Sequence, residues 1–514
     1  MSTLKLKEEL LSLQESGFFK NLCIKRGIER EALRVDINGR VSQRTHPGKL
    51  GSPLTNPNVT TDFSEALMEL VTPTFESPKD LFHHLSDLHG FAYSAMDDEI
   101  LWNFSMPCPF DGEDEIRLAE YGTSNSGQLK HIYRKGLKLR YGSIMQCVAG
   151  IHYNFSITES SWDAFNKNKT QQDIDNKYLG LIRNIKRNAW FLFGHFGASP
   201  VTHQSYLLGR AHNLEVLGQD DLFMPNATTL RMSDIGYQSA VQESLKLRYN
   251  TLPGFINAIK TGIATSHDPF KNLGLFDADG APQQISTGIL QIENELYDIV
   301  RPKRTGKSGE RPSQLLQQHG IEYVELRGLD VNPFVPEGIS ENQIKLLDVF
   351  LMHGLLSDSP LITDEENQNM QRNHKVMVLD GRSEDLQLIQ DGKPSNLDSV
   401  KKAYLEELKM IASAMDAYQP GYTEALESEI AIKPSISQKI LDEMNVKNQS
   451  FKEYGFEKSA AAAKKFLGCK YEDYPEFGSM AKRSVEELKN IEKIEDIDIN
   501  KYVELYNSKL KEEL

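Results

Sequence analysis

The sequence has little cysteine and no long apolar run. Four cysteines (Cys23, Cys108, Cys147 and Cys469) are scattered over 514 residues, and no two of them form a CxxC pair. This scarcity argues against a disulfide framework and against a structural zinc site. No apolar stretch approaches the ~20 residues that a membrane helix needs. The start, MSTLKLKEELLSLQESGFF, carries acids among its leucines and predicts an amphipathic helix, not a signal peptide. Together these features predict a cytoplasmic protein with no membrane partner.

Basic charge and glycine-rich phosphate loops are also lacking. The formal net charge of −15 argues against nucleic acid and anionic membranes as partners. Gly306-Lys307-Ser308 resembles part of a phosphate loop, but that loop needs a glycine where Arg301 stands. No GxGxxG motif opens a helix. A nucleotide would therefore have to be held by metal ions and arginines.

The expected secondary structure differs between two parts of the chain. From about 20 to 335, short strand-like runs alternate with helices, and from about 340 to 514 the pattern is mostly helical. For example, Ser77 and Pro78 predict the start of a helix, and Ser340 can cap another. No linker or fixed-period repeat interrupts the chain, and its last thirty residues predict a solvated helical end. We expect residues 1–514 to form a single compact unit, with a strand-bearing part at about 20–335 and a mostly helical part at about 340–514.

One strand-like segment places two carboxylates side by side. In RGIEREALRV, a strand would put Glu29 and Glu31 on one face and Arg30 on the other. Neighbouring anions on one face repel each other, and the segment offers no cation on that face. The pattern therefore suggests that a cation binds there.

Other strand-like segments repeat this pattern. GIHYNFS puts His152 and Asn154 on one face, IEYVELRGLD pairs Glu325 with Arg327, and TTDFSEALMELVTP carries Asp62 and Glu69. If one sheet gathers these faces, they form an oxygen-rich cup with a single imidazole, which suits Mg²⁺ or Mn²⁺. Such ions favour phosphate oxygens, and an arginine beside them could stabilise a phosphoryl group in transfer.

Each residue also has an ordinary explanation. Glu29 and Glu31 alone are typical of an exposed strand face, and His152 alone of a hydrogen-bonded structural histidine. Asp62 could be a turn or cap residue, and the RPKR run at 301–304 reads as a basic loop. Composition and spacing therefore leave the multi-metal site open.

A family resemblance bears on that choice. The segments RGIERE, TTDFSEAL, LAEYGTSNSG, AGIHYNFS, LRMSDIGY, LQIENELY and GIEYVELRGLDVNPF occur in this order between about 26 and 334. Together they resemble the bacterial monofunctional glutamate–cysteine ligases. Beyond residue 340 the resemblance is weaker and identifies no function.

The resemblance implies an α+β fold of the glutamine-synthetase type, with a curved, mainly antiparallel sheet of about six strands forming a cup wrapped by helices. Residues 1–514 would form a single catalytic unit, and the 20–335 part would bear the sheet and the active site. It also implies a reaction in which ATP phosphorylates the γ-carboxylate of L-glutamate and the amine of L-cysteine attacks the γ-glutamyl phosphate. The products would be γ-glutamylcysteine, ADP and phosphate, in the first step of glutathione biosynthesis. Several Mg²⁺ or Mn²⁺ ions would act as cofactors, and glutathione would be a feedback inhibitor.

Residue roles follow from the same resemblance, position by position. The implied metal ligands are Glu29, Glu31, Asp62, Glu69, His152 and Glu325. Arg327 would stabilise the transferring phosphate, and Arg231 would grip substrate or phosphate. Tyr237 and Tyr297 would form the cysteine side of the pocket. Substrate would also meet Tyr133, Arg134, Gln146 and Asn154.

Two other classes remain open at this stage. One is a carboxylate–amine ligase that uses a different amine. The other is a non-catalytic protein that binds metal or amino acid on the same scaffold, although intact acids at every implied position argue against it.

Overall fold

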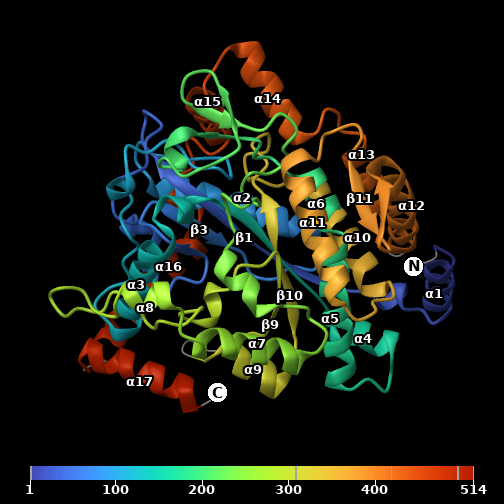
Figure 1. The fold of residues 1–514 in the computed structure, drawn as a ribbon, viewed down its shortest axis with the longest axis horizontal. Helices are drawn as coiled ribbons and strands as arrows, with labels where there is room; N and C mark the ends of the chain where they lie inside the picture. Colours follow the sequence, from blue (N-terminus) through green and yellow to red (C-terminus); the bar gives the residue numbers. More distant parts are fainter. Residues whose placement is uncertain (1–2, 307–309, 418, 495–496, 513–514) are drawn as a thin grey trace.

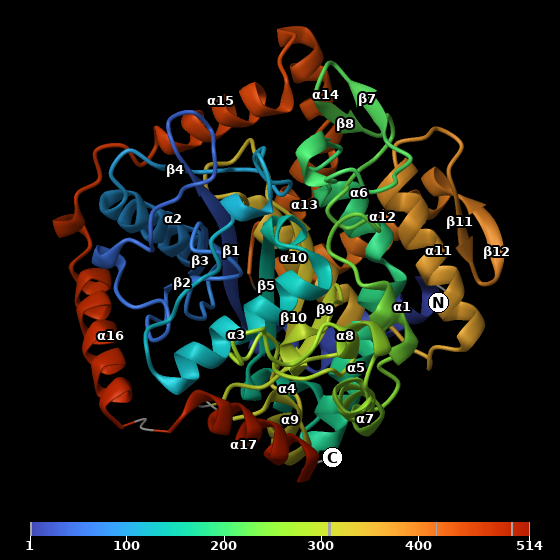
Figure 2. The same ribbon diagram turned by 60° about the vertical axis from the view of Figure 1, so that its left-hand side comes forward.

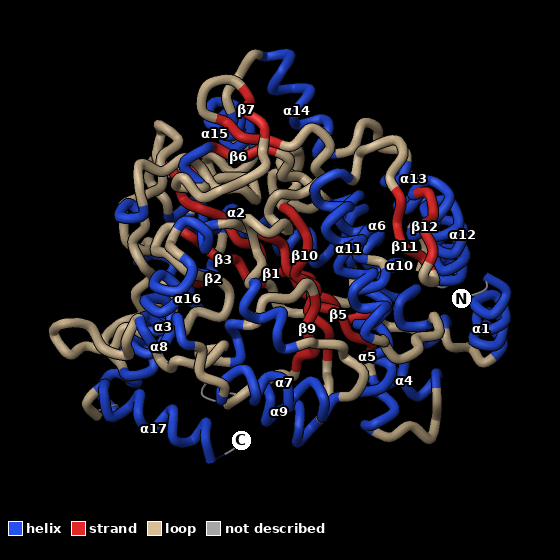
Figure 3. Tube along the Cα trace, in the orientation of Figure 1, coloured by secondary structure: helices blue, strands red, loops and turns tan. Residues whose placement is uncertain are grey.

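A seven-stranded antiparallel sheet forms the centre of the molecule (Figures 1 and 3). The computed structural model describes residues 3–306, 310–417, 419–494 and 497–512, so Lys307 and Ser308 of the rejected phosphate-loop motif lie outside the described residues. Six strands run in the order β2-β3-β1-β5-β10-β9, and β4 pairs with β1. Their bounds are β1 Ile24–Val35, β2 Val59–Thr61, β3 Leu67–Val71, β4 Ile100–Leu101, β5 Gly150–Ile157, β9 Val300–Lys303 and β10 Tyr323–Asp330. The four strands expected to carry the acidic faces are all present.

One face of this sheet is apolar and covered by helices. Ile28, Tyr153 and Leu326 lie on this face in register and are fully buried. The helices that contact it include α2 (Pro78–Ala95), α5 (Gln171–Arg187) and α6 (Ala189–Phe196), and α10 (Glu341–Leu356) packs against α2 and α5. With this face covered, the opposite face is left to carry the polar side chains.

Helix starts follow the local sequence. The Ser77 side chain accepts a hydrogen bond from the backbone N–H of Asp80 at the start of α2. At the start of α10, Ser340 and Gln343 form a reciprocal capping box. Both helices begin where the sequence predicts.

The bulge in β10 is a feature that alternation alone would miss. Strict alternation would put Leu329 on the same face as Glu325 and Arg327. The register shifts between Leu326 and Leu329, so Leu329 pairs with Ile151 and is buried in the core. The bulge lets Arg327 face the acids while the strand returns its next large apolar residue to the core.

The remaining elements surround this centre. The smaller sheets are β6 Val201–His203, β7 Glu215–Leu217 and β8 Asp221–Phe223, and the hairpin of β11 Gln387–Gln390 and β12 Lys393–Asn396. The helices are α1 Thr3–Glu15, α3 Asn125–Tyr141, α4 Glu159–Phe165, α7 Leu252–Ala264, α8 Asp268–Asn272, α9 Pro312–His319, α11 Asp364–Asp380, α12 Leu397–Asp416, α13 Tyr422–Ile430, α14 Ile436–Lys447, α15 Phe451–Ala463, α16 Pro475–Ile494 and α17 Ile499–Glu512. Among the described residues, no helix combines the length and apolarity needed to cross a bilayer.

The last two helices, α16 and α17, each contact earlier parts of the chain along one side. In Figure 2, α16 lies alongside the α2 side of the molecule and α17 runs beneath α3. Val503 of α17 is buried against Ile132 and Ile285. The end is helical as expected and mostly exposed; among the side chains described from residue 485 onward, only Val503 is buried.

Candidate active site

The polar face of the sheet gathers carboxylates around one imidazole. Glu29 lies opposite His152 across β1 and β5, and Glu31 lies opposite Glu69 across β1 and β3. His152 Nδ1 is 3.0 Å from Glu29 Oε2, and its Nε2 is 3.5 Å from Glu31 Oε1. We call Glu29, Glu31, Asp62, Glu69, His152 and Glu325 the acidic cluster.

Two groups of potential ligand atoms occur within the acidic cluster. In each group the atoms lie within 4.8 Å of one another. One group is Glu29, His152 and Glu325, and the other is Glu31, Glu69 and His152. Five of the six predicted ligands are thus brought together, with His152 shared by both groups.

Asp62 belongs to neither group. It follows β2 and lines a small cavity next to Glu31. Its backbone carbonyl accepts hydrogen bonds from the Arg134 side chain and, at 3.0 Å, from the Tyr121 hydroxyl.

Two buried polar atoms of the acidic cluster have no hydrogen-bond partner among the described residues and could coordinate a cation. His152 Nε2 and Glu325 Oε2 are buried and have no hydrogen-bond partner in the described part of the chain. A buried carboxylate oxygen without a partner carries a large desolvation cost. Divalent cations bound at the two groups would satisfy such atoms, and the set of carboxylate oxygens with one imidazole suits Mg²⁺ or Mn²⁺.

Electrostatics divide the cluster into two halves. Burial, followed by repulsion from Glu29, raises the pKa of Glu69 well above its ordinary value. Burial and the Glu31 carboxylate likewise raise the pKa of Asp62. Burial also opposes ionisation of Glu325, but Lys303 and Arg327 outweigh it and hold the pKa of Glu325 well below its usual range. Arg134 and Arg327 act on Asp62 and Arg327 acts on Glu69, but they do not offset burial and the neighbouring acids, so this half of the cluster holds its negative charge only at a cost.

Arg327 lies at the edge of the cluster. Its guanidinium forms an ion pair with Glu325 at 3.1 Å and donates to the Tyr237 hydroxyl at 2.8 and 3.1 Å. The Tyr237 ring packs edge-on against Tyr297, with 4.8 Å between ring centroids. Contacts with Glu325 and Tyr237 thus fix the Arg327 guanidinium beside the acidic cluster.

Arg231 lies behind Arg327 and is fully buried. It donates to the backbone carbonyls of Arg327 and Leu329, both at 3.2 Å. Gly150 makes room for it, because a Cβ at that position would collide with the Arg231 guanidinium. As placed, Arg231 holds the bulged part of β10, and a direct contact with substrate remains a prediction.

A cavity of about 80 Å³ opens beside the cluster. The Tyr297 hydroxyl donates to Gln146 Oε1 at 3.0 Å on its wall. Predicted residues that line this cavity are Glu31, Asp62, Tyr133, Arg134, Gln146, Tyr237, Tyr297 and Arg327. Asn154 lies apart from it and donates to Glu29 Oε1 at 2.9 Å, so Asn154 orients a predicted metal ligand.

The sequence analysis missed two basic residues. The RPKR run is not simply a loop, because Arg301 and Lys303 lie on β9. Lys303 Nζ is 3.4 Å from Glu325 Oε1, and Arg301 lines the small cavity. Alternation within Val-Arg-Pro-Lys would have placed both on one face, but four residues that include a proline gave too weak a strand signal.

The geometry of the acidic cluster and Arg327 defines a class of protein. Carboxylates around one imidazole, with an arginine paired to one of them, form a site for divalent cations and phosphoryl transfer on an antiparallel sheet. An enzyme that activates its substrate with ATP fits such a site.

Comparisons identify the family within that class. The sequence pattern of the glutamate-cysteine ligase family matches residues 10–377. The glutamate–cysteine ligase of Pseudomonas fluorescens Pf0-1 is 42% identical over 497 residues, covering 94% of this chain and 93% of the relative. That of Pseudomonas putida KT2440 is 40% identical over 499 residues, covering 94% of each. The chain belongs to the glutamate–cysteine ligase family.

Solved structures agree on the fold. The glutamate–cysteine ligase of Francisella tularensis, solved in complex with AMP, matches with a TM-score of 0.89 at 33% identity, over 96% of this chain and 99% of that one. A bifunctional glutathione synthetase from Pasteurella multocida matches with a TM-score of 0.71 at 20% identity, over 92% of this chain and 58% of that one, which shows the fold alone. The family, the α+β fold and the ligase class expected from the sequence are confirmed.

Proposed function

We propose that the acidic cluster is the active site at which this chain carries out its family's reaction. ATP phosphorylates the γ-carboxylate of L-glutamate, and the amine of L-cysteine displaces phosphate to give γ-glutamylcysteine, the first step of glutathione biosynthesis. The observation that carries the assignment is that two sets of potential metal ligands share His152 and lie beside the Arg327–Glu325 ion pair.

Divalent cations complete the charge balance of this proposal. Mg²⁺ or Mn²⁺ would be held by the two groups that share His152, with Asp62 close to the second. When bound, such ions neutralise phosphate oxygens and favour the transfer of a phosphoryl group. The unpartnered Glu325 Oε2 and His152 Nε2 support this role.

Arg327 is the proposed catalytic arginine. Its planar guanidinium can donate to two phosphoryl oxygens at once, and its contacts with Glu325 and Tyr237 fix its position beforehand. Lys303 adds positive charge on the other side of Glu325. Arg231 is assigned to gripping substrate or to holding the strand that carries Arg327.

The small cavity is the proposed site of the acceptor amine. Its volume of about 80 Å³ suits a small side chain such as that of cysteine, and Phe63, Leu137 and Met145 give it an apolar part. Tyr237 and Tyr297 form its cysteine side. Tyr133, Arg134 and Gln146 line the glutamate and phosphate side.

Phosphate release from ATP tests the proposal directly. We expect release to require glutamate and to rise when cysteine is added, with γ-glutamylcysteine as the product. A panel of amines tests the alternative acceptor: cysteine or a close analogue should give the highest kcat/KM. Release that does not depend on glutamate, or equal use of unrelated amines, would reject the assignment.

Glutathione is the proposed feedback inhibitor, because it contains the γ-glutamylcysteine unit that the active site makes. Inhibition that added glutamate relieves would support binding at the same site, and no inhibition at millimolar glutathione would count against it.

A cytoplasmic location accords with the use of ATP and with four free cysteines, and fractionation of cells tests it.

A further inference from the structure

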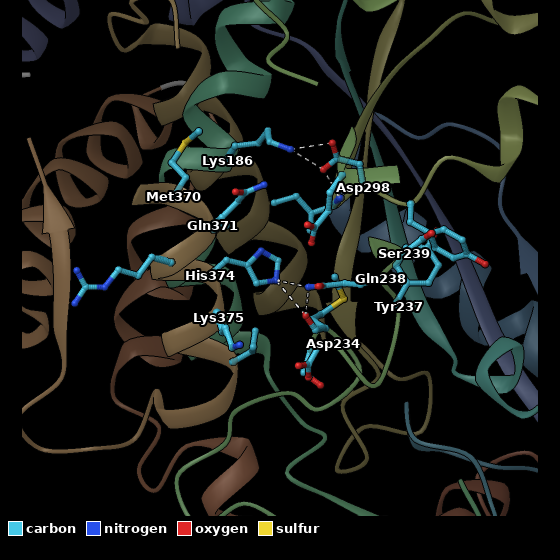
Figure 4. Close-up of a pocket in the computed structure, with 18 of the residues that line it drawn as sticks. Lys186, Asp234, Tyr237, Gln238, Ser239, Asp298, Met370, Gln371, His374 and Lys375 are labelled. Carbon is cyan, nitrogen blue, oxygen red and sulfur yellow. Dashed lines mark hydrogen bonds and ion pairs between the residues drawn. The ribbon is translucent and has the colours of Figure 1, made fainter. Parts of the chain in front are cut away.

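A second, much larger cavity adjoins the acceptor pocket. It has a volume of about 880 Å³ and is bounded by α11, the end of α5, and segments 232–247 and 296–299 (Figure 4). Tyr237 and Tyr297 line both this cavity and the small one. The two rings therefore lie between the proposed acceptor site and the large cavity.

The interior of the large cavity is mostly apolar. Met232, Leu296 and Ile299 are buried in its wall. Among the described residues that line it, the charged side chains are either engaged or exposed. For example, Lys186 pairs with Asp298 at 2.8 Å, whereas Asp234 and Lys375 are exposed. An occupant of the interior would thus meet apolar surface and no uncompensated charge.

His374 presents a ring nitrogen that could recognise a specific atom of an occupant. Its Nε2 lies 3.1 Å from the Met232 carbonyl oxygen and 3.4 Å from Gln238 Nε2. Because the carbonyl can only accept, and Gln238 Nε2 already donates to that carbonyl at 2.7 Å, we assign the proton to His374 Nε2. The other nitrogen, Nδ1, is then an acceptor, and in Figure 4 it points toward the side where Gln371 and Lys186 lie. Burial lowers the pKa of His374 to about 4, so the ring stays neutral near pH 7. Phe193 packs against the ring at 4.3 Å between centroids and holds its orientation.

We propose that this cavity binds an uncharged, largely apolar small molecule that donates an N–H or O–H group to His374 Nδ1, and that the occupant regulates the acceptor site through Tyr237 and Tyr297. The volume lies within the range of small-molecule sites. The binding step stands on the cavity alone, whereas the regulatory step rests on the proposed function.

Binding can be tested with two matched probes, 5-fluoroindole and its 1-methyl derivative, observed by ¹⁹F NMR on the full chain. Both are flat, uncharged and apolar, but only the first has an N–H donor. We expect saturable binding of 5-fluoroindole that is about fivefold tighter than that of the methylated probe, in line with one hydrogen bond. No saturable binding, or equal affinities, would overturn the proposal.

Two variants separate the site from non-specific uptake. Met370→Trp narrows the cavity from α11 and should weaken probe binding at least about fivefold, whereas Gln368→Trp, on an exposed part of the same helix, should leave it unchanged. His374→Phe keeps a ring against Phe193 and should abolish the preference between probes. If His374→Phe does not fold, the two tryptophan variants still show whether the probe binds in this cavity. Equal probe binding by Met370→Trp and Gln368→Trp would refute binding there.

Kinetics test the regulatory step separately. A molecule pressed against the shared tyrosine wall should crowd the smaller cavity, so saturating 5-fluoroindole should raise the KM for cysteine about threefold or more, with less effect on the KM for ATP. Met370→Trp should lose this response. Saturable binding without any kinetic change would overturn the regulatory step, whereas an enzyme inactive toward glutamate and cysteine would overturn the proposed function itself.

Discussion

Glu29 is the residue on which most of the acidic cluster depends. It accepts hydrogen bonds from His152 and from Asn154, and it lies in the group that contains Glu325. Burial and Glu325 oppose its ionisation, but the hydrogen bond from His152 and the positive charge of Lys303 are among the interactions that outweigh them, so the pKa of Glu29 is lowered and it stays anionic. Its negative charge is thus available to a cation at neutral pH.

Replacing Glu29 with glutamine tests that charge. Glu29→Gln keeps the size and an acceptor oxygen, yet we expect kcat/KM to fall at least about a hundredfold, as for loss of a metal ligand or key electrostatic group. The protein should still fold, because one of several mutually repelling carboxylates is removed. Steady-state kinetics at saturating Mg²⁺ measure the effect, with Glu8→Gln on the exposed side of α1 as the control. Near-normal turnover would remove Glu29 from the site.

Arg327→Lys tests in which step of the reaction Arg327 acts. Lysine keeps one positive charge but loses the planar fork that binds two oxygens. We expect kcat to fall about a hundredfold, the typical cost of losing a donor aimed at developing charge, with a smaller change in the KM for cysteine. In a single turnover, ADP formation should slow together with γ-glutamylcysteine formation. Normal ADP formation with slow peptide formation would assign Arg327 to the amine step instead.

At the scale of elements, Asp221 shows how an individual strand is tied to a helix far along the chain. Asp221 lies on β8, and its carboxylate accepts the backbone N–H of Phe451 at the start of α15 at 2.6 Å. It is only 2% exposed, and its Oδ1 has no hydrogen-bond partner within the described residues. Burial raises the pKa of Asp221 to about 6.

This raised pKa predicts a pH-dependent stability. A folded pKa above the unfolded value of ~3.9 means that the folded state holds the proton more tightly, so stability is lost as pH rises from about 4 through about 6. Asp221→Asn removes the charge and keeps an acceptor for Phe451. We expect it to stabilise the protein by roughly 2 kcal/mol at pH 8 and by almost nothing at pH 4.

Denaturant unfolding at the two pH values measures this difference. Asp220→Asn, at the exposed neighbour, should have a much smaller effect. A stabilisation by Asp221→Asn that is equal at pH 4 and pH 8 would show that the carboxyl does not titrate between them.

At the scale of the whole molecule, the acidic cluster joins segments far apart in the chain. Its members come from β1, β3, β5 and β10 and from the segment after β2, so repulsion within the cluster acts against the assembled sheet. A cation that binds only the folded cluster stabilises the entire fold by mass action.

Metal addition should therefore raise the melting temperature. Relative to protein in EDTA, we expect Mg²⁺ or Mn²⁺ at about 100 times its Kd to add roughly 2.7 kcal/mol to the free energy of unfolding. Asp221→Asn, outside the cluster, should keep this gain, whereas Glu325→Gln should lose most of it. Thermal melts with each ion check the prediction, and an equal gain in Glu325→Gln would move the cation site elsewhere.

The sequence by itself determined the strands and which residues share their faces. Alternation is a local property of a strand, so Glu29 with Glu31 and His152 with Asn154 could be paired without knowledge of the fold. Helix caps at Ser77 and Ser340 were equally local. The family resemblance supplied the residue roles, which spacing alone left open.

Only the tertiary structure decided what depends on distant contacts. The bulge that returns Leu329 to the core, the approach of Lys303 to Glu325 and the burial of Val503 on α17 all arise from packing between remote segments. The large cavity behind Tyr237 and Tyr297 is of the same kind, because α11 and two separate loops create it. A sequence specifies local periodicity directly, whereas cavities, bulges and pKa shifts depend on which remote groups meet.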